Sequence, residues 1–284
     1  MKEKNTLLKR LEMQEFPQPE IWELSYPVLL CHGFGAIGGL VKPSPLHDPC
    51  MWMRGHGILA FAPNIVPYAP IETRANTWAR ILKELTHRHG INKFNVVAHS
   101  MGGLDMRYAL AHLGISPMVA SLTTIATPHR GTYLADFVRS TPEILTEKIG
   151  DVVDWFADSV YVKERNDAIG SVEQLTRSYV QKTFNPNTPD PTDIPIFSYS
   201  AGVGKGTKTP LNPIFLFQNN LIHEKEGIND SFVSVESAQW GEHLGTLQLS
   251  HLNQINVQVS TRETKERYTT FWTHLVHHLM DQKL

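Results

Sequence analysis

The sequence predicts an α/β protein in which a mostly parallel sheet is covered by helices on both faces. Short apolar stretches typical of buried strands alternate along the chain with longer stretches of helical period. A sharp turn of small residues around Ser100 joins one of these strands to the helix that follows it. Because an α/β sheet in a chain of 284 residues often remains one unit, we expect a single domain over residues 1–284.

The expected elements follow in order along the chain. The strands are short apolar runs, and the helices repeat apolar residues at helical spacing. In the helix after Ser100, for example, Leu104, Tyr108 and Ala111 form one apolar stripe. The expected strands are Val28–Cys31, Ile58–Ala62, Phe94–Ala98, Leu122–Ala126 and Ile194–Tyr199, and the main helices are Thr73–His89, Gly102–Leu113 and Thr269–Lys283.

Ser100 lies at the centre of the pentapeptide Ala98–Gly102, between an apolar strand and a helix. This is the setting of a nucleophile elbow, in which a strained turn exposes the Ser hydroxyl. Small residues are needed two before and two after the Ser, because strand and helix pass close together there. Gly102 meets the second requirement, and Ala98 adds only a methyl group to the usual Gly at the first. The alternative is an ordinary Ser in a helix cap, but the flanking elements favour the elbow.

A second turn, His32–Gly35, directly follows the first expected strand. Acyl transfer passes through an oxyanion that needs preorganised N–H donors. A Gly-rich turn after an early strand presents one backbone donor, and the residue after the nucleophile presents the other. We therefore assign the oxyanion hole to the N–H groups of Phe34 and Met101. We expect the side chain of His32 to support this loop rather than to act as a base.

A Ser hydroxyl becomes a good nucleophile when a His takes its proton and a carboxylate fixes that His. With a nucleophile elbow, the chain order is Ser, acid, His. Asp230 and His251, each in a short loop, are one possible pair, but the pattern alone does not choose among the candidates. The downstream acids include Asp193, Glu224, Glu226, Asp230, Glu236 and Glu242, and the downstream His residues include His223, His243, His251, His274, His277 and His278.

Composition and charge argue against several other classes of protein. A net charge of −2 without a basic block indicates no nucleic-acid partner. No apolar run approaches the length of a transmembrane helix. The charged N-terminus, Met1–Glu12, lacks the apolar core of a signal peptide, so we expect a cytoplasmic protein or export by a signal-independent route. Cys31 and Cys50 form no metal-binding pattern, and whether they pair is left open.

The segment from about residue 132 to 193 interrupts the alternation of strands and helices. Part of it, residues 149–161, places apolar side chains on one helical face and Asp side chains elsewhere. A helix packed into the core is one interpretation. The other is a lid whose apolar face covers an acyl-binding cleft and turns towards lipid when open. Its position after the elbow favours the lid, whose apolar face includes Val152, Val153, Phe156 and Val160.

Several stretches that span most of residues 26–260 match one known pattern in the same order. They are Val28–Gly35, Asn95–Gly103 with Arg107–Tyr108, Ala126–Thr132, Ser171–Leu175 with Phe184–Asn185, Asn229–Val235 with Ser237–Ala238, and Ser250–Asn256. With them the chain resembles the bacterial true lipases of family I, which include Pseudomonas and Burkholderia triacylglycerol lipases. The resemblance implies an α/β-hydrolase fold with a helical lid insertion. It also implies that Asp230, of the N-D motif, and His251, of the H-L-D motif, complete the triad of Ser100.

The chain departs from the pattern of that family in two places. The family binds a structural calcium near the catalytic His, partly through an Asp two residues after it and a Gln six residues after it. Asn253 and Val257 occupy those positions here. Because a hard cation needs oxygen ligands, we expect no calcium or other metal there. The disulfide positions of the family are also not matched by Cys31 and Cys50.

These observations predict a serine carboxylester hydrolase that cleaves acylglycerols or similar lipid esters without a cofactor. Ser100 is the expected nucleophile, His251 the base and Asp230 the residue that orients the base. An acyltransferase or a thioesterase is the alternative on the same scaffold, because deacylation by another acceptor leaves no trace in the triad. A non-catalytic lipid carrier is a rival of another class, and retention of all the catalytic groups argues against it.

Overall fold

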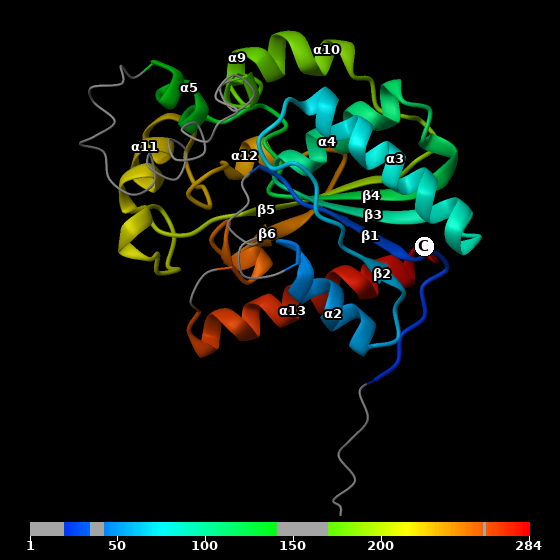
Figure 1. Cartoon of the computed structure of the whole chain (residues 1–284). Coiled ribbons are helices and arrows are strands. Elements are labelled where there is room, and N and C mark those ends of the chain that lie inside the picture. Colours follow the sequence, from blue (N-terminus) through cyan, green and yellow to red (C-terminus); the bar gives the residue numbers. More distant parts are fainter. Residues whose placement is uncertain (1–19, 35–42, 141–169, 258–259) are drawn as a thin grey trace, which may run out of the picture.

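In the part of the chain that the structure describes, six strands form one parallel sheet in the order β2-β1-β3-β4-β5-β6 (Figure 1). The computed structural model of the chain describes residues 20–34, 43–140, 170–257 and 260–284. The central strands β1, β3 and β4 are buried along their whole length; β1 is wholly apolar, whereas β3 and β4 also contain buried Asn, His, Ser and Thr side chains. The strands are β1 (Val28–Cys31), β2 (Ala60–Phe61), β3 (Phe94–His99), β4 (Val119–Ile125), β5 (Ile196–Ala201) and β6 (Glu242–Leu247).

Alternate residues of each strand enter two separate cores, one on each face of the sheet. In β1, Val28 and Leu30 pack with α2 (His47–Gly55) and α13 (Arg262–Asp281). Leu29 and Cys31 pack on the other face, with α3 (Ile71–His89) and α4 (Met101–His112). Figure 1 shows these two helix pairs on opposite sides of the sheet. The expected fold class is therefore confirmed.

A third core lies beyond the carboxyl ends of the strands and joins the start of α4 to the remaining helices. Met101 and Leu104 of α4 pack there with Leu134, Ile222 and Ala238. These come from α5 (Tyr133–Ser140), α11 (Leu216–Glu226) and α12 (Val235–Ala238). The shorter turns of helix are η2 (Ser116–Met118), α9 (Arg177–Tyr179), η3 (Val180–Phe184), α10 (Asn185–Asn187), η4 (Pro213–Phe215) and η5 (Asn253–Ile255).

The sequence predicted β1 with its observed bounds, but it missed β6 and placed the start of α13 too late. Strand β6 is an edge strand with a mostly part-exposed, polar pattern and a Gly at its centre, so only its ladder with β5 makes it a strand. Helix α13 begins at Arg262 because the Thr261 hydroxyl accepts the Thr264 N–H as a cap. The first turns of this helix are polar and therefore carry no apolar period.

The two cysteines do not form the disulfide that the sequence left open. Both are buried free thiols: Cys31 lies in the core beside α3 and α4, and Cys50 in the core beside α2 and α13. The four expected lid residues, Val152, Val153, Phe156 and Val160, lie outside the described residues. Among the helices that the structure describes, none is long and apolar enough to span a membrane.

Candidate active site

Ser100 occupies a sharp, strained turn between β3 and α4. Its backbone has φ 56° and ψ −135°, a region that residues with a side chain rarely adopt. Two hydrogen bonds hold this conformation: the Ser100 N–H donates to the Ile125 carbonyl at 2.9 Å, and the Thr127 hydroxyl donates to the Ser100 carbonyl at 2.7 Å. The turn leaves the Ser100 side chain half-buried rather than buried in the core. The expected elbow geometry is present.

The turn after β1 packs directly against this elbow, backbone to backbone. A Cβ atom on Gly33 would lie 2.7 Å from the Met101 nitrogen and 2.7 Å from the Ser100 Cβ. A Cβ atom on Gly102 would lie 2.7 Å from the Cys31 carbonyl oxygen. Gly102 is therefore required by the end of β1, not by the approach of β3 to α4 that the sequence suggested. This contact places the turn that contains Phe34 beside the Met101 N–H.

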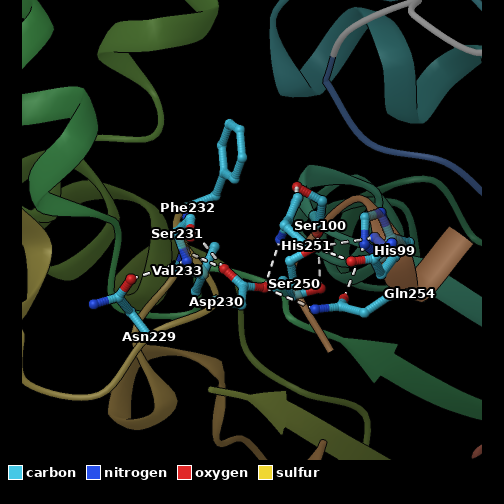
Figure 2. A network of polar contacts seen from close by, with 12 residues as sticks. His99, Ser100, Asn229, Asp230, Ser231, Phe232, Val233, Ser250, His251 and Gln254 are labelled. Atoms are coloured by element: carbon cyan, nitrogen blue, oxygen red, sulfur yellow. Dashed lines mark hydrogen bonds and ion pairs between the residues drawn. The ribbon is translucent and has the colours of Figure 1, made fainter. Parts of the chain in front are cut away.

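His251 links Ser100 to Asp230 through a continuous chain of hydrogen bonds (Figure 2). The distance from His251 Nε2 to Ser100 Oγ is 2.9 Å, and that from His251 Nδ1 to Asp230 Oδ2 is 2.7 Å. Asp230 is fully buried and His251 is 5% exposed, so both contacts are shielded from water. The structure thus brings together the three residues that the resemblance paired.

The Asp230 carboxylate accepts four hydrogen bonds. Oδ1 accepts the N–H groups of Phe232 and Val233 at 3.0 and 2.8 Å. Oδ2 accepts Nδ1–H of His251 and also the amide of Gln254, at 2.8 Å. All four of these partners are N–H groups. The position of the carboxylate is thereby fixed, and Nδ1 of His251 must carry a proton to serve as a donor.

Two rings enclose the His251 imidazole. The Phe232 ring stacks on it with centroids 5.0 Å apart, and the His99 ring lies 4.6 Å away on a tilted plane. The His251 N–H donates to the backbone carbonyl of Asp230 at 3.1 Å. Packing and hydrogen bonds therefore fix both the backbone and the ring of His251.

Three of the other candidates that the sequence left open, His243, Glu226 and Glu224, lie in different surroundings. His243, on β6, contacts the hydroxyls of Ser198 and Ser200 at 3.3 and 3.4 Å. The Glu226 carboxylate accepts the Tyr133 N–H at the start of α5. Glu224 forms an exposed ion pair with Lys205 at 3.7 Å. These side chains have structural partners of their own, away from the elbow.

His32 supports the turn after β1, as expected. Its Nε2 accepts the Ile65 N–H at 3.1 Å, which leaves the proton on Nδ1, 3.0 Å from the Gly33 carbonyl oxygen. Burial, together with the positive charge of Arg74, lowers the pKa of His32 to about 3. The ring is therefore a neutral structural group at ordinary pH. The rest of the predicted turn, from Gly35 on, lies outside the described residues.

A buried ion pair clamps the same turn to α4. Arg74 of α3 donates through Nη2 to the His32 carbonyl at 2.7 Å and through Nε to Asp105 Oδ2 at 2.9 Å. Both side chains are fully buried. Burial raises the pKa of Asp105 to about 6 despite the opposing effect of Arg74. Arg74 thus connects the turn after β1 to α4, the helix that begins beside Ser100.

Asn253 and Val257, at the positions where the family that the chain resembles binds calcium, do not fit a calcium ion. The side-chain oxygen of Asn253 accepts the Ser250 hydroxyl at 2.7 Å, and its amide nitrogen donates to Ser260 at 2.9 Å. Val257 offers no side-chain oxygen. Within the described part of the chain, no group of three His, Cys, Asp or Glu side chains is arranged to hold a metal. The expectation that calcium is not bound here stays a prediction.

Comparisons with known proteins agree with this architecture. A family described as alpha/beta hydrolase of unknown function (DUF915) matches residues 64–142, which contain the elbow. The mature form of Bacillus licheniformis lipase BlEst2 covers 90% of this chain with 96% of its own, at a TM-score of 0.64 and 18% identity. The chain has the α/β-hydrolase fold.

Two curated relatives are more similar to this chain in sequence than the BlEst2 structure is. Triacylglycerol lipase 2 of Saccharomyces cerevisiae is 32% identical over 215 residues, which are 72% of this chain and 60% of the yeast protein. Triacylglycerol lipase of Burkholderia plantarii is 31% identical over 181 residues, which are 58% of this chain and 48% of that protein. The chain therefore spans only about half to three fifths of these relatives.

Sequence reasoning missed the residues that support the site. Arg74 and Asp105 are charged residues on two different helices. The sequence pattern gives no sign that their side chains form an ion pair in the folded protein. Gln254 was part of a matching stretch, but an amide near a catalytic His has no recognisable spacing signal. The one available hint is an acidic residue whose helical neighbours four positions away, Met101 and Ala109, are both apolar.

Replacement of Arg74 by Ala should lower the free energy of unfolding by about 3–5 kcal/mol, because it leaves Asp105 as a buried charge without its partner. Arg88→Ala on the same helix is the control. Arg88 pairs with Glu84 at the surface, where its side chain is 66% exposed, and should contribute at most about 1 kcal/mol. Urea denaturation measures both. Equal losses in the two variants would contradict the clamp.

The stability of the protein should fall as the pH falls below about 6.5. Burial lowers the pKa of His32, His99 and His129, so the unfolded chain takes up these protons before the folded chain does. Each such His contributes a slope of about 1.4 kcal/mol per pH unit. Asp105, with its raised pKa, opposes the trend between about pH 4 and 6.

The slope is therefore best compared between variants. Between pH 6 and pH 4, the unfolding free energy of His32→Asn should depend less steeply on pH than that of the wild type. The difference in slope should be about 1.4 kcal/mol per pH unit, which corresponds to one proton. Chemical denaturation at several pH values gives the slope, and His274→Asn, on an exposed position of α13, serves as the control. A His32→Asn slope equal to that of the wild type would be inconsistent with a neutral, buried His32.

Proposed function

We propose that this chain is a serine carboxylester hydrolase that cleaves lipid esters through an acyl-enzyme. The hydrogen-bonded chain from Ser100 through His251 to Asp230 carries this proposal. A Ser on a strained turn, 2.9 Å from a His that a buried carboxylate orients, is the arrangement that acyl transfer requires. No cofactor is needed for this chemistry.

In the acylation step, Ser100 Oγ attacks the ester carbonyl carbon and transfers its proton to His251 Nε2. Asp230 accepts the Nδ1–H and so stabilises the imidazolium that forms. The carbonyl oxygen becomes an oxyanion between the N–H groups of Phe34 and Met101, which the Gly33 contact keeps adjacent. His251 then protonates the leaving alcohol.

In the deacylation step, His251 removes a proton from water, and the hydroxide attacks the acyl carbon on Ser100. The second oxyanion occupies the same hole. Its collapse returns the proton to Ser100 and releases the fatty acid. The half-buried position of Ser100 allows water and ester to reach it, whereas Asp230 and His251 stay shielded.

The relatives named triacylglycerol lipase support acylglycerols as the substrate class. Kinship with the bacterial true lipases of family I is the finer proposal, and the Burkholderia relative supports it. The chain departs from that family where the family binds calcium, because Asn253 and Val257 replace two of the ligands; the Asn253 side chain instead contacts Ser250 and Ser260. We also retain the lid as a proposal. It rests on the apolar face that the sequence places at Val152, Val153, Phe156 and Val160.

Ser100→Ala should abolish ester hydrolysis and leave the fold intact, because the change removes only the nucleophilic oxygen. His251→Ala should lower turnover by at least about 10³-fold, since nothing then accepts the Ser100 proton. Asp230→Asn should also be severe, because an amide favours the wrong His251 tautomer. Turnover of a dissolved p-nitrophenyl ester, with circular dichroism as a check of folding, measures all three.

His243→Ala is the matched control for these variants, since His243 contacts only Ser198 and Ser200 among the hydrogen bonds described above. It should retain turnover close to that of the wild type. An organophosphonate should label Ser100 alone. Substantial turnover by Ser100→Ala, or a larger loss in His243→Ala than in His251→Ala, would overturn the assignment of the triad.

The lid proposal predicts a difference between two substrates. Exposure of large apolar side chains to water costs roughly 1.5–3 kcal/mol each, and a lipid surface offsets that cost. Val153→Asp combined with Phe156→Ser should therefore reduce hydrolysis of emulsified long-chain triglyceride far more than hydrolysis of a dissolved short-chain ester. Equal losses on both substrates would mean that this segment is not a lid.

A further inference from the structure

Gln254 connects the candidate acid to the residue before the nucleophile. Its amide nitrogen donates to Asp230 Oδ2 at 2.8 Å, and its amide oxygen lies 3.0 Å from His99 Nε2 (Figure 2). Gln254 is fully buried, so water does not compete for either contact. A single side chain therefore reaches two members of the triad: Asp230 directly, and Ser100 through its neighbour His99.

The orientation of the Gln254 amide follows from the charge of Asp230. A carboxylate only accepts hydrogen bonds, so the NH₂ group must face Asp230 and the amide oxygen must face His99. His99 must then carry its proton on Nε2 to donate to that oxygen. Burial, together with the charge of His251, lowers the pKa of His99 well below its usual value, which keeps the ring neutral. Asp230, the Gln254 amide and His99 therefore each have one possible donor or acceptor role in this series of hydrogen bonds.

The backbone of Gln254 is fixed as well. Its carbonyl accepts the indole N–H of Trp272, on α13, at 3.2 Å, and its N–H donates to the Ser250 carbonyl at 3.2 Å. Trp272 is itself fully buried in the core beneath the sheet. The buried Trp272 therefore helps to hold Gln254 in place, so the position of its amide against Asp230 does not depend on the loop alone.

We propose that Gln254 is a positioning residue for ester hydrolysis, which fixes the Asp230 carboxylate against His251 and ties it to the nucleophile elbow through His99. This inference rests on the proposed function. Asp230 Oδ2 accepts from Gln254 and His251 at once, so the amide restricts this oxygen to the direction in which it meets Nδ1–H. Without the amide, the oxygen can move, and the tautomer and angle of His251 are less well defined.

Gln254→Met is the first variant to test, because it keeps the length of the side chain and removes both polar contacts. It should lower kcat roughly tenfold or more for a dissolved ester, with KM changed less than about twofold, since no substrate contact is lost. Gln174→Met is the matched control. Gln174 also donates to a carboxylate at 2.8 Å, but that carboxylate is Glu72, so kcat should stay at the wild-type value.

Gln254→Glu adds a readout that a merely structural residue would not show. When protonated, the introduced carboxyl group can donate to Asp230 and accept from His99, as the Gln254 amide does. When ionised, it faces Asp230 as a like charge. The ratio of the kcat of this variant to that of the wild type should therefore be highest at low pH and fall as pH rises, with Asp230, His99 and His251 the titratable groups around it. Gln174→Glu should give a ratio that does not follow this trend.

Two results would overturn the proposal: a kcat for Gln254→Met within about twofold of the wild type, or a pH-independent ratio for Gln254→Glu. If Gln254→Met does not fold, the pH ratio decides. A wild-type protein without esterase activity would instead contradict the proposed function. In that case the downfield proton resonance of the Asp230–His251 hydrogen bond, assigned by its loss in His251→Ala, still tests Gln254. It should shift or broaden in Gln254→Met and stay unchanged in Gln174→Met.

Discussion

The close contact between the turn after β1 and the nucleophile elbow is the constraint on which the rest of the site depends. Gly33 and Gly102 allow two backbones to meet where any Cβ would overlap. The same contact aligns the Met101 N–H with the Phe34 turn, and it coincides with a Ser100 conformation that costs of order 1–3 kcal/mol. Two hydrogen bonds stabilise this turn: Arg74 donates to the His32 carbonyl, and the His32 ring accepts the Ile65 N–H. The energetic cost of the elbow is thus offset by its surroundings.

The parallel sheet explains how distant residues meet at this point. His32 follows β1, Ser100 follows β3, and His251 follows β6 after a short loop. Because the carboxyl ends of parallel strands share one edge of the sheet, the segments that follow them gather there. Asp230 joins them from the loop after α11, where two backbone N–H groups and Gln254 hold its carboxylate. In this candidate site, hydrogen bonds fix the side chains of Asp230 and His251, whereas the side chain of Ser100 is half-buried.

The sequence predicted the elements whose signal is local. The apolar runs of β1 and β3 and the small residues around Ser100 are determined by nearest neighbours, and they were found. The edge strand β6 was missed because only its partner β5 makes it a strand. The acid and base could not be chosen from the pattern, since Asp230 and His251 meet Ser100 only in the folded chain. The Arg74–Asp105 pair and the Gln254 amide were beyond reach for the same reason: their partners are distant in sequence and leave no periodic trace.

We propose that Ser100 attacks an acyl carbon while the N–H groups of Phe34 and Met101 bind the oxyanion. The most direct measurement is a crystal structure of the protein after reaction with an alkyl phosphonate, whose tetrahedral phosphorus imitates the acylation intermediate. We expect a covalent bond from phosphorus to Ser100 Oγ, with one phosphonyl oxygen about 2.7–3.1 Å from the backbone nitrogens of both Phe34 and Met101. An adduct on another residue, or a phosphonyl oxygen directed away from these two nitrogens, would contradict the proposal.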